Sequence, residues 1–306
     1  MGFYHIPVLL PQAMEALSVQ CDGVYVDCTA GGGSHSAAIL EKLTTGKLIC
    51  IDRDPYAIAH LNEKFSAYIP EKVEIFHDTY DNIGAILGER KAKGVLADLG
   101  VSSVQLDTAE RGFSFHNDAP LDMRMGQEGK TAADVVNAYS EADLSGIIFN
   151  YGDEKFARSI AKNIVKSRTE KPIETTFELV DIIKKSMPAK AMRDGHPARR
   201  TFQAIRIEVN DEIRILENSV EAMFEGLEIG GTLSIITFHS LEDRVVKNIF
   251  RELCTGCTCP KEFPVCVCNK TPRGKIKHKP ITASEEELKQ NPRARSAKLR
   301  SIVRLK

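Results

Sequence analysis

The fold is decided by the stretch Asp27-Cys28-Thr29-Ala30-Gly31-Gly32-Gly33-Ser34-His35, in which a glycine-rich turn joins an apolar run to a helical pattern. The run 24–27 before the turn is typical of a buried strand, and we expect a helix from 34 to about 43. Glycine lets the backbone approach a ligand closely and adopt positive φ. A helix that begins directly after such a turn offers unpaired N–H groups, so the stretch predicts a ligand-binding turn.

The same alternation of strand and helix continues outward from this turn. Apolar strands are expected at 47–52, 73–78 and 94–99, with a helix at 55–65. After an interruption the alternation returns, with a helix at 208–227, a strand at 232–238, a helix at 241–253 and a closing strand at 301–305. Continuously apolar strands that alternate with helices predict a doubly wound α/β fold, with a parallel sheet covered on both faces.

The interruption predicts an inserted domain. Residues 107–125 are rich in Asp, Gly, Arg and Phe without periodicity, which indicates a long ordered loop, and 131–183 are helical in pattern throughout. We therefore assign 1–106 and 201–306 to the α/β core and 107–200 to a helical domain inserted after its fourth strand. A length of 306 residues agrees with two domains.

Polar residues follow the strands of the predicted core. Asp52 ends the second strand and Asp98 the fourth, and ligands bind at the carboxyl ends of strands in open α/β sheets. Asp52 can accept both hydroxyl protons of a ribose. Ser36 replaces the third glycine of the dinucleotide fingerprint, and Asp27 suits a cationic ligand better than a pyrophosphate. Together these features favour S-adenosylmethionine over NAD.

Two of the strand-end residues allow more than one interpretation. Asp98 could accept a hydrogen bond from an amino group of a substrate, or it could simply cap its strand. His239 follows the strand at 232–238 and could face the same crevice, or it could be an ordinary surface histidine with its own partners.

The net charge of −1 conceals an asymmetry. Residues 270–306 contain twelve Lys or Arg against three Glu, a local balance of +9, so the rest of the chain sums to −10. A basic end on an acidic chain predicts a polyanionic partner, although a solvated, lysine-rich end explains it equally well. No apolar run approaches the roughly 20 residues of a membrane helix, and residues 1–10 lack a signal-peptide pattern, so we expect a cytoplasmic protein.

Long motifs along nearly the whole chain resemble one enzyme family, that of ribosomal RNA small subunit methyltransferase H. The motifs are His5-x-Pro7-Val8-Leu9-Leu10, the 31–35 turn, Ile51-Asp52-Arg53-Asp54, Asp98-Leu99-Gly100-Val101-Ser102-Ser103-x-Gln105-Leu106-Asp107, Arg111-Gly112-Phe113-Ser114-Phe115, Leu121-Asp122-Met123-Arg124-Met125, 201–210, 237–244 and 295–300. The resemblance implies a Rossmann-like class I methyltransferase core with an inserted helical domain that recognises the substrate.

The resemblance also implies an activity and a cofactor site. The activity is methyl transfer from S-adenosylmethionine to the exocyclic N4 of a cytidine in the decoding region of small-subunit ribosomal RNA, as free RNA or within the small ribosomal subunit. The family's cofactor contacts fall on Gly33, Ser34, His35, Asp52, Tyr80, Asp98 and Gln105. Family members commonly have Gly in place of Ser34 and often Phe in place of Tyr80, and either ring can stack on adenine.

The implied chemistry makes demands on the site. The N4 lone pair of cytosine is delocalised into the ring, so acceptors for the amino protons are needed to favour a pyramidal nitrogen. We expect Asp98 and the main-chain carbonyl of Leu99 or Gly100 to be those acceptors. The base must also be unpaired or flipped out to reach the cofactor. Contacts with the substrate are expected from Asp122, Arg124, Arg199, Arg200, His239 and Ser240.

Other functions remain possible from the sequence alone. An amino-group methyltransferase acting on DNA or protein would need the same cofactor turn. A non-catalytic RNA-binding ribosome assembly factor with a vestigial pocket is a further alternative, against which the intact glycine turn, Asp52 and Asp98 argue.

Five of the eight cysteines crowd into Cys254-x-x-Cys257-x-Cys259 and Cys266-x-Cys268. In a reducing compartment such a cluster indicates a metal site rather than disulfides. Cys257, Cys259, Cys266 and Cys268 could surround a tetrahedral structural zinc. The C-x-C spacing departs from the usual C-x-x-C pairs, so free thiols on a loop are the alternative. No metal is expected at the site of methyl transfer, because that reaction needs none.

Overall fold

The computed structural model describes residues 7–191, 195–260, 265 and 267–306. His5 of the first motif and Cys266 of the predicted zinc site lie outside the described residues. The chain divides into two compact units, which are described separately. Unit 1 consists of Met1–Gly100 and Ile213–Lys306, and unit 2 of Val101–Glu212.

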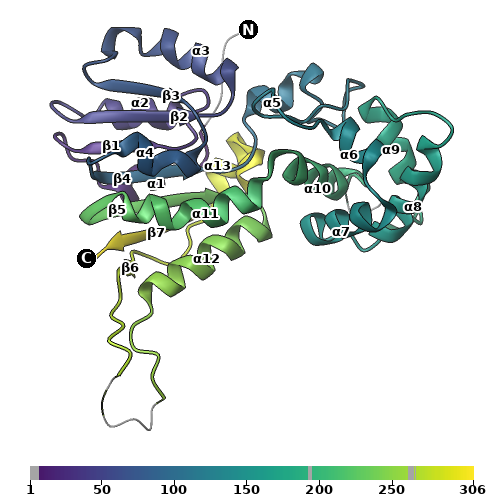
Figure 1. The fold of residues 1–306 in the computed structure, drawn as a ribbon. Helices are drawn as coiled ribbons and strands as arrows, with labels where there is room; N and C mark the ends of the chain where they lie inside the picture. The colour runs from purple at the N-terminus through teal and green to yellow at the C-terminus, as the bar shows by residue number, and fades with distance from the viewer. Residues whose placement is uncertain (1–6, 192–194, 261–264, 266) are drawn as a thin grey trace. The chain divides into compact units, whose positions relative to one another are not determined.

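A seven-stranded sheet in the order β3-β2-β1-β4-β5-β7-β6 forms the centre of unit 1 (Figure 1). The strands are β1 (Val24–Asp27), β2 (Lys47–Asp52), β3 (Val73–His77), β4 (Ala92–Asp98), β5 (Leu227–Thr237), β6 (Gly274–Ile276) and β7 (Lys298–Arg304). β3, β2, β1, β4 and β5 are parallel, whereas β7 runs antiparallel to β5 and β6 antiparallel to β7. The predicted α/β class is confirmed, and the strand order reverses between β1 and β4.

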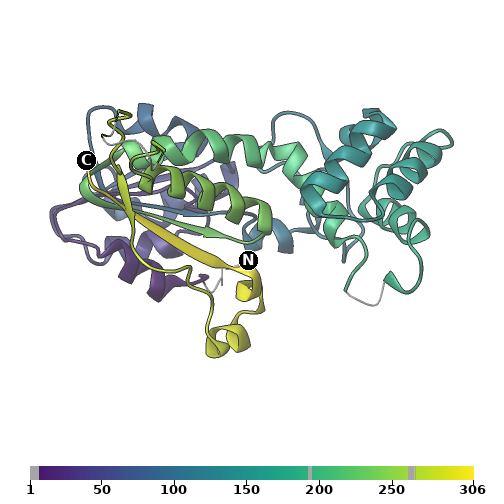
Figure 2. The same ribbon diagram turned by 90° about the horizontal axis from the view of Figure 1, so that it is seen from below.

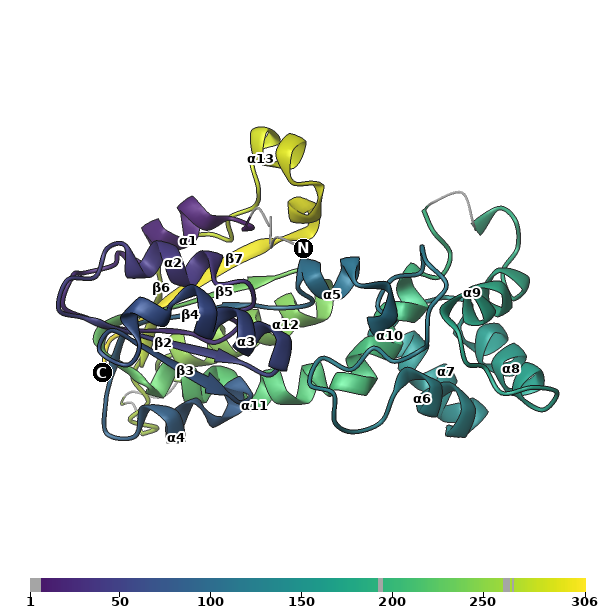
Figure 3. The ribbon, with the colours of Figure 1, turned by 90° about the horizontal axis from the view of Figure 1, so that it is seen from above.

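Helices cover both faces of this sheet (Figures 2 and 3). One face carries α1 (Leu10–Leu17), α2 (Ser34–Leu40) and α3 (Pro55–Lys64), and the other carries α4 (Ile83–Leu87), α11 (Glu212–Glu225) and α12 (Ser240–Cys254). Leu17, Ile39 and Leu61 pack with the strands in one apolar cluster, whereas Val220 and Val246 belong to the second. Because both faces are buried, the strands are continuously apolar rather than alternating.

The remaining short elements of unit 1 lie between or after these helices and strands. They are η1 (Ser66–Tyr68), η2 (Tyr80–Asn82), α13 (Glu285–Gln290) and η5 (Pro292–Ser296). None of the described helices, in either unit, combines the length and the apolar character needed to cross a membrane.

Unit 2 is helical. Its elements are α5 (Ser103–Asp107), η3 (Ala109–Arg111), α6 (Ala132–Ala138), α7 (Glu141–Gly152), α8 (Ala157–Arg168), α9 (Thr176–Lys185) and α10 (Arg199–Asn210). Thr131, Ser140 and Thr175 cap the N-termini of α6, α7 and α9, each accepting a backbone N–H three residues later, which fixes where those helices begin. The apolar faces of the helices meet in one core that includes Ile160 and Leu179.

The unit boundaries differ from those expected at 107 and 200. α5 and α10 belong to unit 2 because Leu106 and Phe202 pack into its core. The helix expected at 208–227 is two helices, since Asp211 adopts a left-handed φ of 53° between α10 and α11. Asp tolerates this conformation better than most residues, so the break leaves no strong mark on the sequence.

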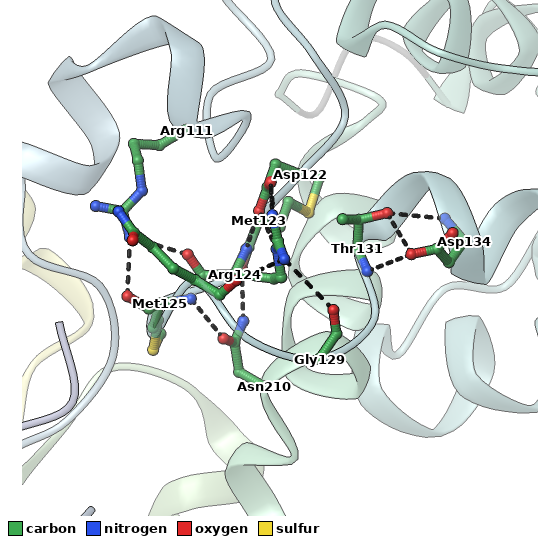
Figure 4. Close-up of polar contacts among 10 residues, drawn as sticks. Arg111, Asp122, Met123, Arg124, Met125, Gly129, Thr131, Asp134 and Asn210 are labelled. Atoms are coloured by element: carbon green, nitrogen blue, oxygen red, sulfur yellow. Dashed lines mark hydrogen bonds and ion pairs between the residues drawn. The ribbon is translucent and has the colours of Figure 1, made fainter. Parts of the chain in front are cut away.

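The loop that precedes α6 is ordered by buried polar contacts (Figure 4). Asn210 accepts the N–H of Met125 at 2.8 Å and donates to the carbonyl of Met123 at 2.7 Å. From the other side, Arg111 donates through Nη2 to the carbonyls of Arg124 and Met125, each at 2.9 Å. Side chains therefore supply the hydrogen bonds that a helix or strand would otherwise provide.

The substitution Asn210→Ala tests this arrangement. It removes the partners of two buried backbone groups, and we expect a loss of about 1–3 kcal/mol in the free energy of unfolding. Chemical denaturation monitored by circular dichroism measures the change. Asn62→Ala is the matched control, because the Asn62 amide is exposed and makes a local bond to Ile58. A loss at Asn210 no larger than that at Asn62 would contradict the assigned role.

Candidate active site

Three acidic residues occupy the carboxyl ends of neighbouring parallel strands in unit 1. Asp27 ends β1, Asp52 ends β2 and Asp98 ends β4. Parallel pairing aligns the strands in register, with Asp27 opposite Cys50 on one side and Leu96 on the other. The three carboxylates therefore lie at one edge of the sheet, beside the point where the strand order reverses, as the sequence indicates.

The glycine turn between β1 and α2 needs its glycines at two positions. Gly31 has a φ of 49°, and its N–H donates to Oδ2 of Asp52 at 2.7 Å. Gly33 has a φ of 69° at the N-cap of α2, and a Cβ there would lie 2.9 Å from Cδ2 of Leu61. Both positions favour glycine, because L-residues with side chains rarely adopt this backbone conformation.

Asp52 is bonded to backbone N–H groups through both carboxylate oxygens. Oδ2 accepts from Gly31, and Oδ1 accepts from the N–H of Asp54 at 2.8 Å. Each carboxylate oxygen can accept a second hydrogen bond, so two hydroxyl groups of a ribose can still be bound. Burial raises the pKa of Asp52 to about 6.

Asp27 is hydrogen-bonded to the turn and to the first turn of α2. Its side chain is buried, with Oδ1 accepting the N–H of Thr29 at 3.3 Å and Oδ2 accepting the hydroxyl of Ser36 at 2.6 Å. Ser36, which replaces a glycine of the dinucleotide fingerprint, thus anchors the first turn of α2 to the end of β1. Burial raises the pKa of Asp27 to about 6.

His35 is neutral at pH 7 and presents a lone pair toward Asp98. Burial lowers the pKa of His35 to about 4. Nε2 lies 3.1 Å from the carbonyl of Val8, which accepts only if Nε2 carries the proton. Nδ1 is then an acceptor, and it lies 3.7 Å from Oδ2 of Asp98.

Asp98 has an unsatisfied buried oxygen. Its Oδ1 atom is buried without a hydrogen-bond partner among the described residues. Burial raises the pKa of Asp98 well above its ordinary value, and the charges of Asp27 and Glu242 add to the effect. A buried acceptor without a donor is costly, and here a second acceptor, His35 Nδ1, lies beside the same carboxylate. The arrangement fits a ligand that brings N–H groups and positive charge, and it does not fit a pyrophosphate.

His239 has a local structural role. As the N-cap of α12 its Nδ1 accepts the N–H of Glu242 at 3.4 Å, and its Nε2 lies 3.0 Å from Oε1 of Glu242. Glu242 is buried and accepts the N–H of Phe238 at 2.7 Å. We did not single out Glu242 from the sequence, although the spacing of a polar residue and Glu three positions apart is the signal of a capping box. Ser240 is exposed.

The other predicted cofactor residues are divided between the two units. In unit 1, Ser34 begins α2, and Tyr80 begins η2 and packs against the second apolar cluster. In unit 2, Gln105 is buried in α5, where its side-chain oxygen accepts the N–H of Ser102 at 3.0 Å. The contact of Gln105 with a cofactor stays a prediction.

The substrate residues predicted in unit 2 differ in their surroundings. Arg124 forms an ion pair with Asp122, with Nη2 and Oδ2 2.7 Å apart (Figure 4). Arg199 and Arg200 are exposed at the start of α10, and Nη1 of Arg200 donates to the carbonyl of Asp153 at 2.8 Å. The roles of all four toward a substrate stay predictions.

Comparison with known proteins gives matches along almost the entire chain. A sequence model of the MraW methylase family matches residues 2–305. Ribosomal RNA small subunit methyltransferase H of Clostridium botulinum strain Kyoto / Type A2 is 56% identical over 306 residues, 98% of each chain, and the protein of that name from strain Loch Maree / Type A3 matches equally. A solved structure described as a putative rRNA-methylase from Clostridium thermocellum covers 98% of this chain and 100% of its own, with 11% identity and a TM-score of 0.46.

The raised pKa of Asp27 predicts how stability depends on pH. A carboxyl whose folded pKa lies above its unfolded value stabilises the protein below pH 4, and this contribution is lost as the pH rises through about 6. Asp27→Asn keeps the shape and removes the charge. Relative to the unchanged protein, the variant should therefore gain stability between pH 4 and pH 7, by up to about 3 kcal/mol.

Asp22→Asn is the control for this measurement. Its hydrogen bond with Lys93 lowers the pKa of Asp22, so the ionised carboxylate stabilises the folded protein above about pH 4, and this variant should be less stable than the unchanged protein throughout that range. Denaturant unfolding of the three proteins across this range measures both effects. The assigned burial of Asp27 is wrong if both variants change the free energy of unfolding in the same direction.

Proposed function

The chain belongs to the MraW methylase family and is an S-adenosylmethionine-dependent methyltransferase, and we propose that its acceptor is the N4 amino group of a cytidine in the decoding region of small-subunit ribosomal RNA. The relatives are named as methyltransferases of small-subunit ribosomal RNA, and they match over 98% of the chain. We also propose a role for each residue of the site in binding the cofactor or activating this nitrogen.

One observation carries the proposed chemistry. Asp98 ends a central strand with a buried oxygen that lacks a donor among the described residues. A primary amino group has two N–H bonds and is the kind of group that can satisfy this oxygen. A hydroxyl acceptor has one proton to give, so it could satisfy this oxygen but not a second acceptor such as the main-chain carbonyl of Leu99 or Gly100.

The glycine turn, together with residues at the end of β2 and after β3, is proposed to hold the cofactor. S-Adenosylmethionine supplies an electrophilic methyl group on a positively charged sulfur when it is bound. Asp52 would accept the ribose hydroxyls, the ring of Tyr80 would stack on the adenine, and the glycine turn would leave room for the methionine part. The raised pKa values of Asp27, Asp52 and Asp98 favour a cationic donor over a neutral or anionic one, because a nearby positive charge stabilises their ionised forms.

Asp98 prepares the acceptor nitrogen for attack. Its carboxylate accepts a hydrogen bond from one N4 proton, and the main-chain carbonyl of Leu99 or Gly100 accepts from the other. These bonds favour the pyramidal nitrogen of the transition state, in which the new N–C bond forms as the methyl leaves sulfur. The nitrogen then carries a positive charge and an acidic proton, which Asp98 takes up and passes to water. Its raised pKa suits that step.

Unit 2 is proposed to recognise the RNA. Arg199 and Arg200 are exposed on α10 and provide positive charge for phosphate groups. Asp122 and Arg124 already bind each other, so a nucleotide that contacts either residue has to compete with this ion pair. The target cytidine must leave its stack before its amino group can reach a sulfonium.

The substitution Asp98→Asn separates catalysis from stability. It removes a buried ionisable group that is costly to charge, so the variant should unfold at the same temperature as the unchanged protein or higher. Methyl transfer at saturating cofactor should fall by about 10²–10³-fold, since an amide cannot take up the proton and only its oxygen accepts a hydrogen bond. Single-turnover assays with labelled cofactor measure the rate, and calorimetry measures cofactor affinity separately.

Asp22→Asn serves as the control here too, because Asp22 is exposed and precedes the opposite end of β1. A rate for Asp98→Asn within a factor of about two of the unchanged protein, with cofactor saturating, contradicts the role of Asp98 in activating the amine.

The acceptor itself is tested on ribosomal RNA. RNA from cells lacking the protein should lack a methyl group on the N4 of one decoding-region cytidine, and purified protein with S-adenosylmethionine should restore it. Mass spectrometry of nuclease fragments identifies the base and the position. Methylation of DNA or protein instead, or unchanged RNA despite cofactor binding, overturns the proposed acceptor while leaving the enzyme class intact.

A further inference from the structure

The segment between α12 and β6 forms a paired extension of unit 1. Its two ends are joined by a hydrogen bond from the N–H of Arg273 to the carbonyl of Leu253 at 2.8 Å. Close by, a Cβ on Gly256 would lie 3.2 Å from Cδ of Pro272, so the outgoing and returning arms are in contact. Figure 1 shows the two arms leaving α12 and returning to β6.

Three cysteines from the two arms converge. The sulfur atoms of Cys257, Cys259 and Cys268 all lie within 4.8 Å of one another, and those of Cys257 and Cys268 are 3.7 Å apart. Zinc bound tetrahedrally at about 2.3 Å from each sulfur places neighbouring sulfurs about 3.8 Å apart. A disulfide needs about 2.0 Å instead. The Cys257–Cys268 distance therefore matches two ligands of one metal ion.

A backbone contact supports the same assignment. The N–H of Val267 donates to Sγ of Cys259 at 3.4 Å. Hydrogen bonds of this kind orient metal ligands, so the contact fixes the direction of the Cys259 sulfur.

Regular secondary structure does not stabilise the described part of the extension. Its described residues, 255–260, 265 and 267–273, form no helix or strand. The side chains of Val265 and Val267 are 70% and 68% exposed, so these two apolar side chains are not packed into a core. A bound metal would supply a cross-link that holds the cysteines of the two arms together.

We propose that Cys257, Cys259 and Cys268 bind one zinc ion as thiolates and that this ion fixes the two arms of the extension. Each thiol releases its proton on binding, and no electron transfer takes place. The site is structural, because methyl transfer needs no metal. Cys266 lies outside the described residues and is not part of the proposal, which is independent of the proposed RNA substrate.

Metal content tests the proposal directly. The full-length protein, purified without chelator, should contain about one zinc per chain by elemental analysis. The variants Cys257→Ser and Cys259→Ser should lose this zinc, whereas Cys21→Ser, at an exposed cysteine before β1, should retain it. Replacement of zinc by cobalt should give the charge-transfer absorption of cobalt–thiolate bonds in the unchanged protein and not in the two cluster variants.

Proteolysis tests the structural role without reference to activity. Removal of zinc by a chelator should accelerate tryptic cleavage after Lys270 by at least about tenfold, because the released arm becomes accessible. The cluster variants should be cleaved rapidly with or without chelator. The proposal is overturned if zinc in the unchanged protein does not exceed that in Cys257→Ser. It is also overturned if a Cys257–Cys268 disulfide is found in protein purified anaerobically, or if chelation leaves cleavage unchanged.

Discussion

The site depends on the concentration of negative charge at one edge of the parallel sheet. Asp27, Asp52 and Asp98 end three strands that lie side by side, and burial raises the pKa of each. The charges of Asp27 and Glu242 raise the pKa of Asp98 further. A cationic ligand relieves this repulsion, whereas an anionic one increases it. The three acidic residues at the strand ends therefore favour a sulfonium donor over the anionic pyrophosphate of a dinucleotide.

The turn after β1 fixes these carboxylates by linking three strand ends. Thr29 donates its N–H to Asp27, and its hydroxyl accepts the N–H of Asp98 at 2.6 Å. Gly31 donates to Asp52. Each bond comes from the backbone or a short side chain, so little rotamer freedom is lost in forming it. The acidic groups are consequently held in place by the fold, which is the arrangement that electrostatic catalysis requires.

The parts of this fold that depend on local sequence could be predicted, and those that depend on tertiary contacts could not. β1 and β2 match the expected ranges, because each is an apolar run bounded by turn residues. β5 begins five residues before the expected 232, because the strand continues through Gly230 and Gly231, which the sequence indicates as a turn. The pairing of β4 with β5 is irregular between Ala92 and Gly94 for the same reason.

The same distinction holds for the site. The acids at the strand ends could be found from the sequence, since strand ends and glycines are local features. The neutral state of His35 and the unsatisfied oxygen of Asp98 could not, because both depend on burial by segments far away in the chain, such as Val8. Gln105 and His239 each take part in the capping box of a helix, a structural role that stands beside their predicted contacts with ligands.

The basic C-terminal end shows why a charge count is a weak guide to a polyanionic partner. Arg300 and Lys298 both pair with Asp243, and Arg273 and Arg304 both pair with Glu225. These four cations hold β7 and the start of β6 against α11 and α12, so much of the local balance of +9 is compensated within unit 1. Exposed cations that pair with none of these acids, such as Lys270, Lys275, Lys279, Lys289 and Arg295, can attract phosphate groups.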